Sequence, residues 1–268
     1  MKEITIVSGK GGTGKTSIVA SFATLAKKNL LVDADVDAAD LHLVMSPTVL
    51  YKEDFKGGHK ATINQKICTQ CGECIERCQY NAISADFIVN SMNCEGCGVC
   101  VHYCPVEAID FPQRTCGEWY ISDTPVCPMV HAKLGIAEEN SGLLVSLVRK
   151  QARILAEKKN IEIIIVDGPP GIGCPVIAAI TGADAVLIVT EPTLSGMHDM
   201  DRIKDLTSFL NVPALLCVNK YDLNREISDI IVNMAENNNM QFVGSIPYDR
   251  DVTYAMVAGK SLIDFSNG

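Results

Sequence analysis

The stretch Gly9-Lys10-Gly11-Gly12-Thr13-Gly14-Lys15-Thr16 decides the fold of this 268-residue chain. It matches the P-loop pattern G-x4-G-K-[ST], which cradles the phosphates of a nucleotide. Glycines let backbone N–H groups curl around phosphate oxygens, and the positive N-terminal end of the following helix faces the same charge. We expect Lys15 to neutralise the phosphates and Thr16 to ligate Mg²⁺. The alternative, a glycine-rich turn that fits by chance, is disfavoured by the strand and helix patterns on either side.

The segments around this loop alternate between strand and helix patterns. An apolar run at 4–7 precedes the loop, an amphipathic helix pattern from Ile18 to Ala26 follows it, and a second apolar run lies at 30–32. Further strand-like runs occur at 161–166, 185–189, 214–218 and 242–246, and helix patterns at 143–156, 200–210 and 227–236. Continuous apolar strands alternating with helices predict an α/β P-loop NTPase fold, with a mostly parallel sheet covered by helices on both faces.

One cysteine-rich segment interrupts this pattern. It contains the same spacing twice, Cys68-x2-Cys71-x2-Cys74-x3-Cys78 and Cys94-x2-Cys97-x2-Cys100-x3-Cys104-Pro105. We therefore divide the chain into a first P-loop part (1–60), a small inserted α+β domain (61–113) and a second P-loop part (114–268). The repeated spacing is typical of bacterial ferredoxins with two [4Fe–4S] clusters.

In that ferredoxin pattern the fourth cysteine of each run ligates the other cluster. The first cluster is accordingly expected on Cys68, Cys71, Cys74 and Cys104, and the second on Cys78, Cys94, Cys97 and Cys100. Zinc is the competing interpretation, but two identical four-cysteine runs do not match the separated pairs of zinc ribbons. Gln79 replaces the proline usual after the fourth cysteine, which affects the local turn more than the ligation.

Lys10 makes the P-loop similar to the deviant Walker A motif of the MinD, ParA, Mrp and nitrogenase-iron-protein class. The resemblance implies that Lys10 reaches the nucleotide of a partner subunit, and that Lys10, Lys15 and Asp35 are catalytic, with Asp35 orienting the attacking water. It further implies that Asp167 holds Mg²⁺ through water and that the Gly171 N–H faces the γ-phosphate. The implied ATP and Mg²⁺ site comprises Gly9, Lys10, Gly11, Gly12, Thr13, Gly14, Lys15, Thr16, Ser17, Asp167, Gly171, Asn219 and Pro247.

Other acidic residues near these motifs have open roles. Asp33 precedes Asp35, while Asp37 and Asp40 fit either a nucleotide loop or a solvated acidic turn. Asp222 completes Asn219-Lys220-x-Asp222, which resembles a motif at the adenine edge, and Tyr248 and Asp249 follow Pro247 on the base side.

The whole chain resembles MinD-superfamily P-loop ATPases that contain an inserted two-cluster ferredoxin domain. Segments 128–132 and 138–142 also look like parts of this family. The resemblance implies ATP, Mg²⁺ and two [4Fe–4S] clusters as cofactors. It also implies an ATPase that is slow without its partner, and a homodimer or a heterodimer with a paralogue.

Four cysteines lie outside the repeated pattern. Cys217 falls within an apolar run and is expected in the core, and Cys116 receives no role. Cys127 and Cys174 stand roughly where the nitrogenase iron protein, by resemblance, has cluster ligands. The two could hold a further cluster between subunits, although ordinary thiols are the favoured interpretation; clearly more than about eight iron atoms per chain, the content of two four-iron clusters, would support the cluster.

Composition restricts the class of partner. The formal net charge is −9, which disfavours nucleic-acid binding, and no apolar run is long enough to span a membrane. The chain opens directly into a strand without a signal-peptide pattern, so we expect a cytoplasmic protein. Its 12 cysteines then indicate cluster ligation rather than disulfides.

These observations leave three functions open. The leading one is an ATP-hydrolysing iron–sulfur protein that couples nucleotide state to electron transfer toward an unidentified redox partner protein. The first alternative is an iron–sulfur or metallocofactor assembly factor, although no Cys-x-x-Cys follows Pro112. The second is a MinD- or ParA-like positioning ATPase, which the acidic charge and the short, non-basic C-terminal segment disfavour.

Overall fold

The computed structural model of the chain describes residues 1–135 and 141–266. Its residues form two compact units, one of residues 1–53, 119–133 and 141 onward, and one of residues 54–118 with the segment that starts at Leu134. Residues 138–140 of the family-like segment 138–142 lie outside the described part. No helix among the described residues is long and apolar enough to cross a membrane.

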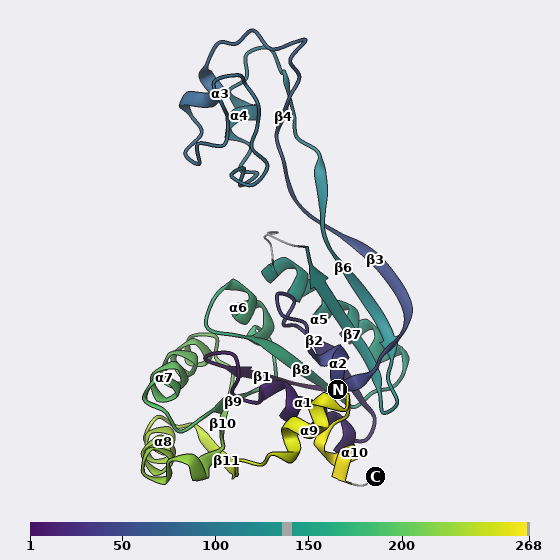
Figure 1. Cartoon of the computed structure of the whole chain (residues 1–268), viewed down its shortest axis with the longest axis vertical. Coiled ribbons are helices and arrows are strands. Elements are labelled where there is room, and N and C mark those ends of the chain that lie inside the picture. The colour runs from purple at the N-terminus through teal and green to yellow at the C-terminus, as the bar shows by residue number, and fades with distance from the viewer. Residues whose placement is uncertain (136–140, 267–268) are drawn as a thin grey trace. The chain divides into compact units, whose positions relative to one another are not determined.

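The first unit is built on a mostly parallel sheet flanked by helices (Figure 1). Nine strands of the described chain join this sheet in the order β11-β10-β9-β1-β8-β2-β7-β6-β3. Their bounds are β1 Lys2–Ser8, β2 Asn29–Asp33, β3 Thr48–His59, β6 Gln113–Asp123, β7 Pro128–Leu134, β8 Ile163–Pro170, β9 Ala185–Thr190, β10 Ala214–Asn219 and β11 Gln241–Ile246. The pairs β1/β8, β1/β9, β2/β8, β2/β7, β9/β10 and β10/β11 are parallel.

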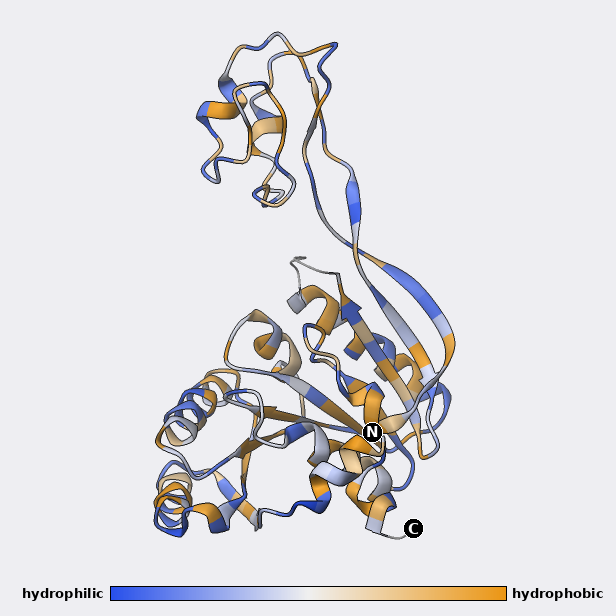
Figure 2. Cartoon of the chain, viewed as in Figure 1, coloured by the Kyte–Doolittle hydropathy of each residue, from blue (hydrophilic) through white to orange (hydrophobic). Residues whose placement is uncertain are grey.

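Alternate strand residues divide the core between the two faces of the sheet. Ile6 packs with Ile18 and Val19 of α1 on one face, whereas Val7 packs with Met200 and other residues of α6, α7 and α8 on the opposite face. The helices of this unit are α1 Lys15–Leu25, α2 Leu41–Met45, α5 Ser141–Lys158, α6 Cys174–Ile180, α7 Leu194–Phe209, α8 Arg225–Asn237, α9 Asp251–Val257 and α10 Leu262–Ser266. Figure 2 shows the consequence, with apolar central strands and helices that mix apolar and polar residues. The predicted parallel α/β fold with helices on both faces is therefore confirmed.

Three strands of this sheet, β3, β6 and β7, are absent from the prediction. β3 has a short apolar run, Val49 to Tyr51, which is exposed, and its other residues are mostly polar, so the strand lacks the long apolar pattern of a buried strand. Trp119 of β6 is buried and lies 5.2 Å from Tyr51, centroid to centroid. Aromatic packing of this kind stabilises the strands through contacts that the local sequence does not indicate.

The second unit contains the repeated cysteine motif. Besides the parts of β3 and β6 that fall within residues 54–118, its described regular elements are the antiparallel pair β4 Thr62–Ile63 and β5 Ile109–Asp110, and the short helices α3 Glu73–Glu76 and α4 Val99–His102. Each helix starts after a glycine with positive φ, Gly72 at 86° and Gly98 at 74°. These glycines hold corresponding places between the second and third cysteines of the two runs, so the sequence repeat is also a structural repeat.

Candidate functional site

The glycine-rich loop connects β1 to α1 in a conformation that requires glycine. Gly14 has φ +86°, and a Cβ atom placed on it would lie 2.4 Å from Nδ2 of Asn219. That same amide donates to the Thr13 carbonyl oxygen at 2.7 Å. A Cβ atom on Gly9 would lie 2.0 Å from Cβ of Asp199, so the backbone of the loop approaches α7 closely. The loop is thus held by β10 on one side and by α7 on the other.

Lys15 lies at the centre of a group of carboxylates. Its Nζ atom is 2.5 Å from Oδ1 of Asp167 and 3.8 Å from Oδ2 of Asp35, and its side chain is 7% exposed. Burial alone would lower the pKa of Lys15, but the carboxylates of Asp167, Asp35 and Asp33 outweigh that effect and raise it. Lys15 therefore stays protonated, as neutralisation of phosphate requires.

The carboxylates around Lys15 carry more negative charge than one lysine can balance. Burial and the neighbouring Asp167 raise the pKa of Asp33, although Lys15 opposes them. Burial also raises the pKa of Asp35 to about 6; Lys15 lowers that pKa and Asp167 raises it further. Oδ2 of Asp33 and the Thr13 hydroxyl oxygen are buried without a hydrogen-bond partner among the described residues. Excess buried carboxylate oxygen suits a hydrated divalent cation.

Two cavities flank the loop. One, of about 410 Å³, is lined by Lys15, Thr16, Asp35 and Asp40 together with the loop glycines. The other, of about 430 Å³, is lined by Asn219, Pro247, Tyr248, Asp249 and apolar residues of α1 and α10. Both include Gly12, Gly14, Ser17 and Met256, so they meet at the loop. A polar cavity beside a more apolar one suits the phosphates and the base of a nucleotide.

The other predicted residues of this site differ in their surroundings. The Gly171 N–H, expected to face a γ-phosphate, donates to the Ser8 carbonyl oxygen at 2.9 Å. Asp37 is exposed. Asp222 accepts a hydrogen bond from the Tyr248 N–H at 2.7 Å, so it holds the loop on the base side rather than lining that cavity.

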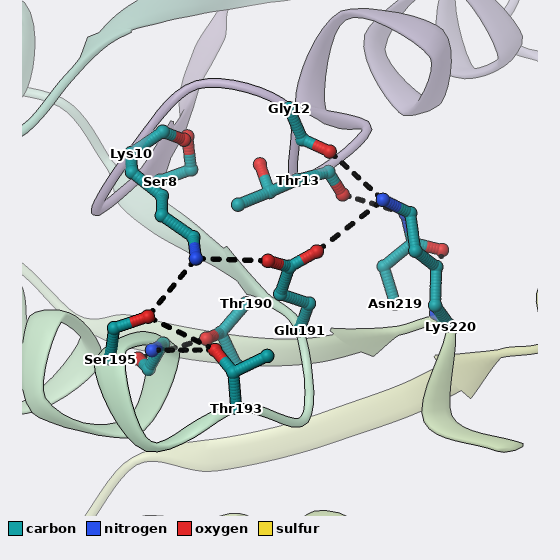
Figure 3. Close-up of polar contacts among 11 residues, drawn as sticks. Ser8, Lys10, Gly12, Thr13, Thr190, Glu191, Thr193, Ser195, Asn219 and Lys220 are labelled. Atoms are coloured by element: carbon teal, nitrogen blue, oxygen red, sulfur yellow. Dashed lines mark hydrogen bonds and ion pairs between the residues drawn. The ribbon is translucent and has the colours of Figure 1, made fainter. Parts of the chain in front are cut away.

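Lys10 makes its contacts within its own chain. Its Nζ atom lies 3.1 Å from Oε1 of Glu191 and donates to Oγ of Ser195 at 3.0 Å (Figure 3). The other carboxylate oxygen of Glu191 is 3.3 Å from Nζ of Lys220, which also donates to the Gly12 carbonyl oxygen at 2.9 Å. Sequence reasoning missed Glu191, Ser195 and Asp199, and it included Lys220 only as part of the Asn219-Lys220-x-Asp222 motif, without a role of its own. Its one available signal for Glu191 and Lys220 was their position just beyond predicted strands.

Each predicted cluster set lines one cavity of the second unit. Cys68, Cys71, Cys74 and Cys104 line one, and Cys78, Cys94, Cys97 and Cys100 line another. Both cavities are otherwise mainly apolar, with Ile109 and Phe87 beside the first and Phe111 and Ile83 beside the second. Each cavity is therefore lined by four thiols, three from one cysteine run and one from the other.

Backbone N–H groups point to sulfur atoms in both sets. Gln70 donates to Sγ of Cys68 at 3.4 Å, Ala82 to Sγ of Cys78 at 3.4 Å, and Ala108 to Sγ of Cys104 at 3.2 Å. Such donors favour thiolates. Among the described residues, no three His, Cys, Asp or Glu side chains are arranged to hold a single metal ion. Four thiols per cavity are the kind and number of donors that a [4Fe–4S] cluster requires.

The remaining cysteines lie in different environments. Cys127 is buried at the start of β7, and burial raises the pKa of its thiol to about 11. Cys174 is exposed at the start of α6, beyond the end of β8. β7, β2 and β8 are parallel. Cys127 precedes the N-terminal end of β7 and Cys174 follows the C-terminal end of β8, so within one chain the two thiols lie at opposite ends of the strands and are not brought together. Burial likewise raises the pKa of Cys217 to about 11, and Cys116 is buried.

Comparisons with known proteins agree with the nucleotide site. The model of the family "CobQ/CobB/MinD/ParA nucleotide binding domain" matches residues 4–262. An uncharacterized protein of Methanocaldococcus jannaschii is 35% identical over 275 residues, which cover 99% of this chain and 91% of that protein. The septum site-determining protein MinD of Buchnera aphidicola (subspecies Acyrthosiphon pisum) is 24% identical over 281 residues, which cover 97% and 83% of the two chains.

A solved structure shows the same fold. The septum site-determining protein MinD of Pyrococcus horikoshii, determined in complex with Mg-ADP, superimposes with a TM-score of 0.59 at 17% identity. The match covers 99% of this chain and 89% of the MinD chain.

Proposed function

This chain belongs to the CobQ/CobB/MinD/ParA nucleotide-binding domain family, and on that basis we propose that it binds Mg-ATP and hydrolyses it as a MinD/ParA-type ATPase. The observation that carries the proposal is Lys15, held among Asp167 and Asp35 at the polar cavity beside the glycine loop. Among the functions left open by the sequence, the comparisons favour this one over iron–sulfur electron transfer, which none of them shows.

The residues of the nucleotide site have separate roles in binding and hydrolysis. The N–H groups of the loop and Lys15 bind the phosphates, and Asn219 and Pro247 border the cavity for the base. The Thr16 hydroxyl, Asp35 and Asp167 would hold Mg²⁺ directly or through water, and the metal would balance the charge of the β and γ phosphates. Asp35 also orients the attacking water. Lys10 completes the site of a second copy or of a paralogue, which makes hydrolysis slow in an isolated chain.

Nucleotide binding and hydrolysis by the purified protein test this proposal. Lys15→Ala should lower the hydrolysis rate by at least about 100-fold, because it removes a preorganised charge at the phosphates. Lys27→Ala, at an exposed position just after α1, is the matched control and should hydrolyse ATP like the wild type. Equal rates for wild type and Lys15→Ala, or a wild type that does not bind ATP, would refute the proposal.

The two thiol-lined cavities support a second function in the same chain. We infer that they hold two [4Fe–4S] clusters with crossed ligation, through which the protein exchanges electrons with a redox partner in a nucleotide-dependent way. Bound clusters would supply one-electron transfer. The protein supplies the thiolates, the N–H donors to sulfur and the mainly apolar walls of the two cavities.

Paired cysteine substitutions test the ligation without any activity assay. The wild type should contain about eight iron atoms per chain, as two four-iron clusters require. With crossed ligation, Cys68→Ser combined with Cys104→Ser removes one cluster and leaves about four iron atoms, whereas Cys68→Ser with Cys78→Ser removes both. Cys217→Ala, a buried thiol of the first unit, should keep the full content. The reverse pattern for the two double variants would refute crossed ligation.

Two further measurements separate the roles of the clusters. If cluster reduction and transfer to a partner proceed identically with and without ATP, the nucleotide coupling is wrong. If iron moves readily to an apo-acceptor protein, the assembly-factor alternative replaces electron transfer.

A further inference from the structure

Glu191 joins two lysines that both belong to the surroundings of the nucleotide loop. One of its carboxylate oxygens contacts Lys10 and the other contacts Lys220 (Figure 3). The sheet order explains this arrangement, because β9 lies between β1 and β10. Lys10, Glu191 and Lys220 follow the carboxyl ends of these three parallel strands, so the acid is placed between the two bases.

The position of Lys10 depends on this carboxylate. Its ammonium group donates to Ser195, which lies in the first turn of α7 next to the cap residue Thr193. The N-terminal end of a 16-residue helix carries positive partial charge, which disfavours a nearby cation. The carboxylate of Glu191, whose side chain is 18% exposed, offsets that charge. Without it, the ammonium group would gain little by staying at α7.

Lys10 can leave this position at low cost. The Ser8 hydroxyl donates to the Lys10 carbonyl oxygen at 3.0 Å, and Ser8 is fully buried, so the backbone stays fixed while the side chain swings. Glu191 keeps its contact with Lys220 after Lys10 departs, which avoids an unpaired carboxylate in a largely buried place. Lys220 is itself anchored on the Gly12 carbonyl oxygen.

We propose that Glu191 is a positioning residue that holds Lys10 within its own chain and releases it to the nucleotide of a second copy, with Lys220 neutralising the carboxylate left behind. The inference rests on the proposed function of Lys10 as a residue that acts across a dimer. In this scheme Glu191 opposes association, and Lys220 favours it.

Self-association of the full-length protein, measured by sedimentation velocity with Mg²⁺ and a slowly hydrolysed ATP analogue, tests the proposal. Glu191→Gln should lower the dimer dissociation constant roughly tenfold, since each dimer releases two lysines and one partly exposed pair changes an equilibrium about threefold. Ser195→Ala should shift it less in the same direction. Lys220→Gln should raise it, because Glu191 then holds Lys10 more tightly. A purely structural role would impair association in all three variants.

Glu162→Gln is the matched control for Glu191→Gln. Oε1 of Glu162 also pairs with a lysine, Nζ of Lys28, at 2.6 Å. Glu162 is exposed and precedes β8, so it lies at the N-terminal ends of the parallel strands, away from Glu191. This variant should associate like the wild type. The affinity of monomeric Glu191→Gln for the analogue, measured by calorimetry at low protein concentration, should also equal that of the wild type.

Three results would overturn the proposal. If wild type and Glu191→Gln dimerise equally, Glu191 does not restrain Lys10, but the proposed function as a dimeric ATPase is unaffected. If monomeric Glu191→Gln binds the analogue more weakly, Glu191 only supports the conformation of the loop. If no form dimerises with the analogue at any concentration, the proposed action of Lys10 across a dimer fails, and this inference fails with it.

Discussion

At the scale of single residues, the pKa of Asp35 is shifted strongly by burial and by the charges around it. Burial raises the pKa of its carboxyl group to about 6, and Asp167 adds to the shift while Lys15 opposes it. The folded protein therefore binds a proton at Asp35 more tightly than the unfolded chain does. Between the ordinary value of 3.8 and about 6, the free energy of unfolding falls as pH rises, and above that range the full cost persists.

The first prediction follows from this shift. In metal-free protein, Asp35→Asn should raise the free energy of unfolding by about 1–2 kcal/mol at pH 8, a value discounted for partial solvent screening. The gain should shrink towards pH 4.5, where Asp35 is mostly protonated in the folded state. Urea titrations with chelator at the two pH values measure it. A gain that grows as the solution is acidified would contradict the assignment.

At the scale of the elements, a buried ion pair joins the central strand to two helices. Glu3 of β1 accepts from Nε of Arg149 at 2.6 Å and from Nε of Arg153 at 2.7 Å, both on α5. Arg149 also donates to the carbonyl oxygens of Ala178 and Thr181, at α6 and its end. Glu3 and Arg149 are 4% and 6% exposed, so neither charge is compensated by water.

The second prediction concerns this connection. Glu3→Gln should lower the free energy of unfolding by about 3–5 kcal/mol, because it leaves the charge of Arg149 buried without its partner. Lys28→Gln breaks the exposed pair with Glu162 and should cost less than about 1 kcal/mol. Denaturant unfolding of both variants measures the difference. Equal small losses would show that the backbone carbonyls alone satisfy Arg149.

At the scale of the whole molecule, Lys10 of a single chain contacts Glu191 and Ser195 of that same chain rather than the phosphate cavity. The third prediction uses two variants that should each be inactive alone, Lys10→Ala and Lys15→Ala. Mixed dimers should contain one complete site, in which the Lys10→Ala chain binds ATP and its partner supplies Lys10.

A steady-state ATPase assay on the mixture measures this complementation. The equimolar mixture should regain roughly a quarter of the wild-type activity, because about half of the dimers are mixed and each has one intact site. Either variant assayed alone at the same total concentration is the control. A mixture as inactive as its components would show that Lys10 does not act across the dimer.

The sequence alone determined the features that depend on local patterns. Continuous apolar runs identified β1, β2, β8, β9, β10 and β11 of the large sheet, because strands inside a covered parallel sheet are rich in apolar residues. The P-loop placed Lys15 at a helix start, because the loop chemistry requires that spacing. The cysteine spacing grouped the eight thiols into the sets that line the two cavities, although it leaves the presence of clusters to the iron measurements.

Only the tertiary structure decided the contacts that depend on strand order and long-range packing. β3 is mostly exposed and polar beyond Tyr51, so its place as an edge strand of the sheet follows from pairing with distant residues. Glu191 meets both Lys10 and Lys220 because β9 lies between β1 and β10, an order that no local pattern specifies. Residues about 180 and 30 positions apart become neighbours there, since parallel strands bring their carboxyl ends to one edge of the sheet.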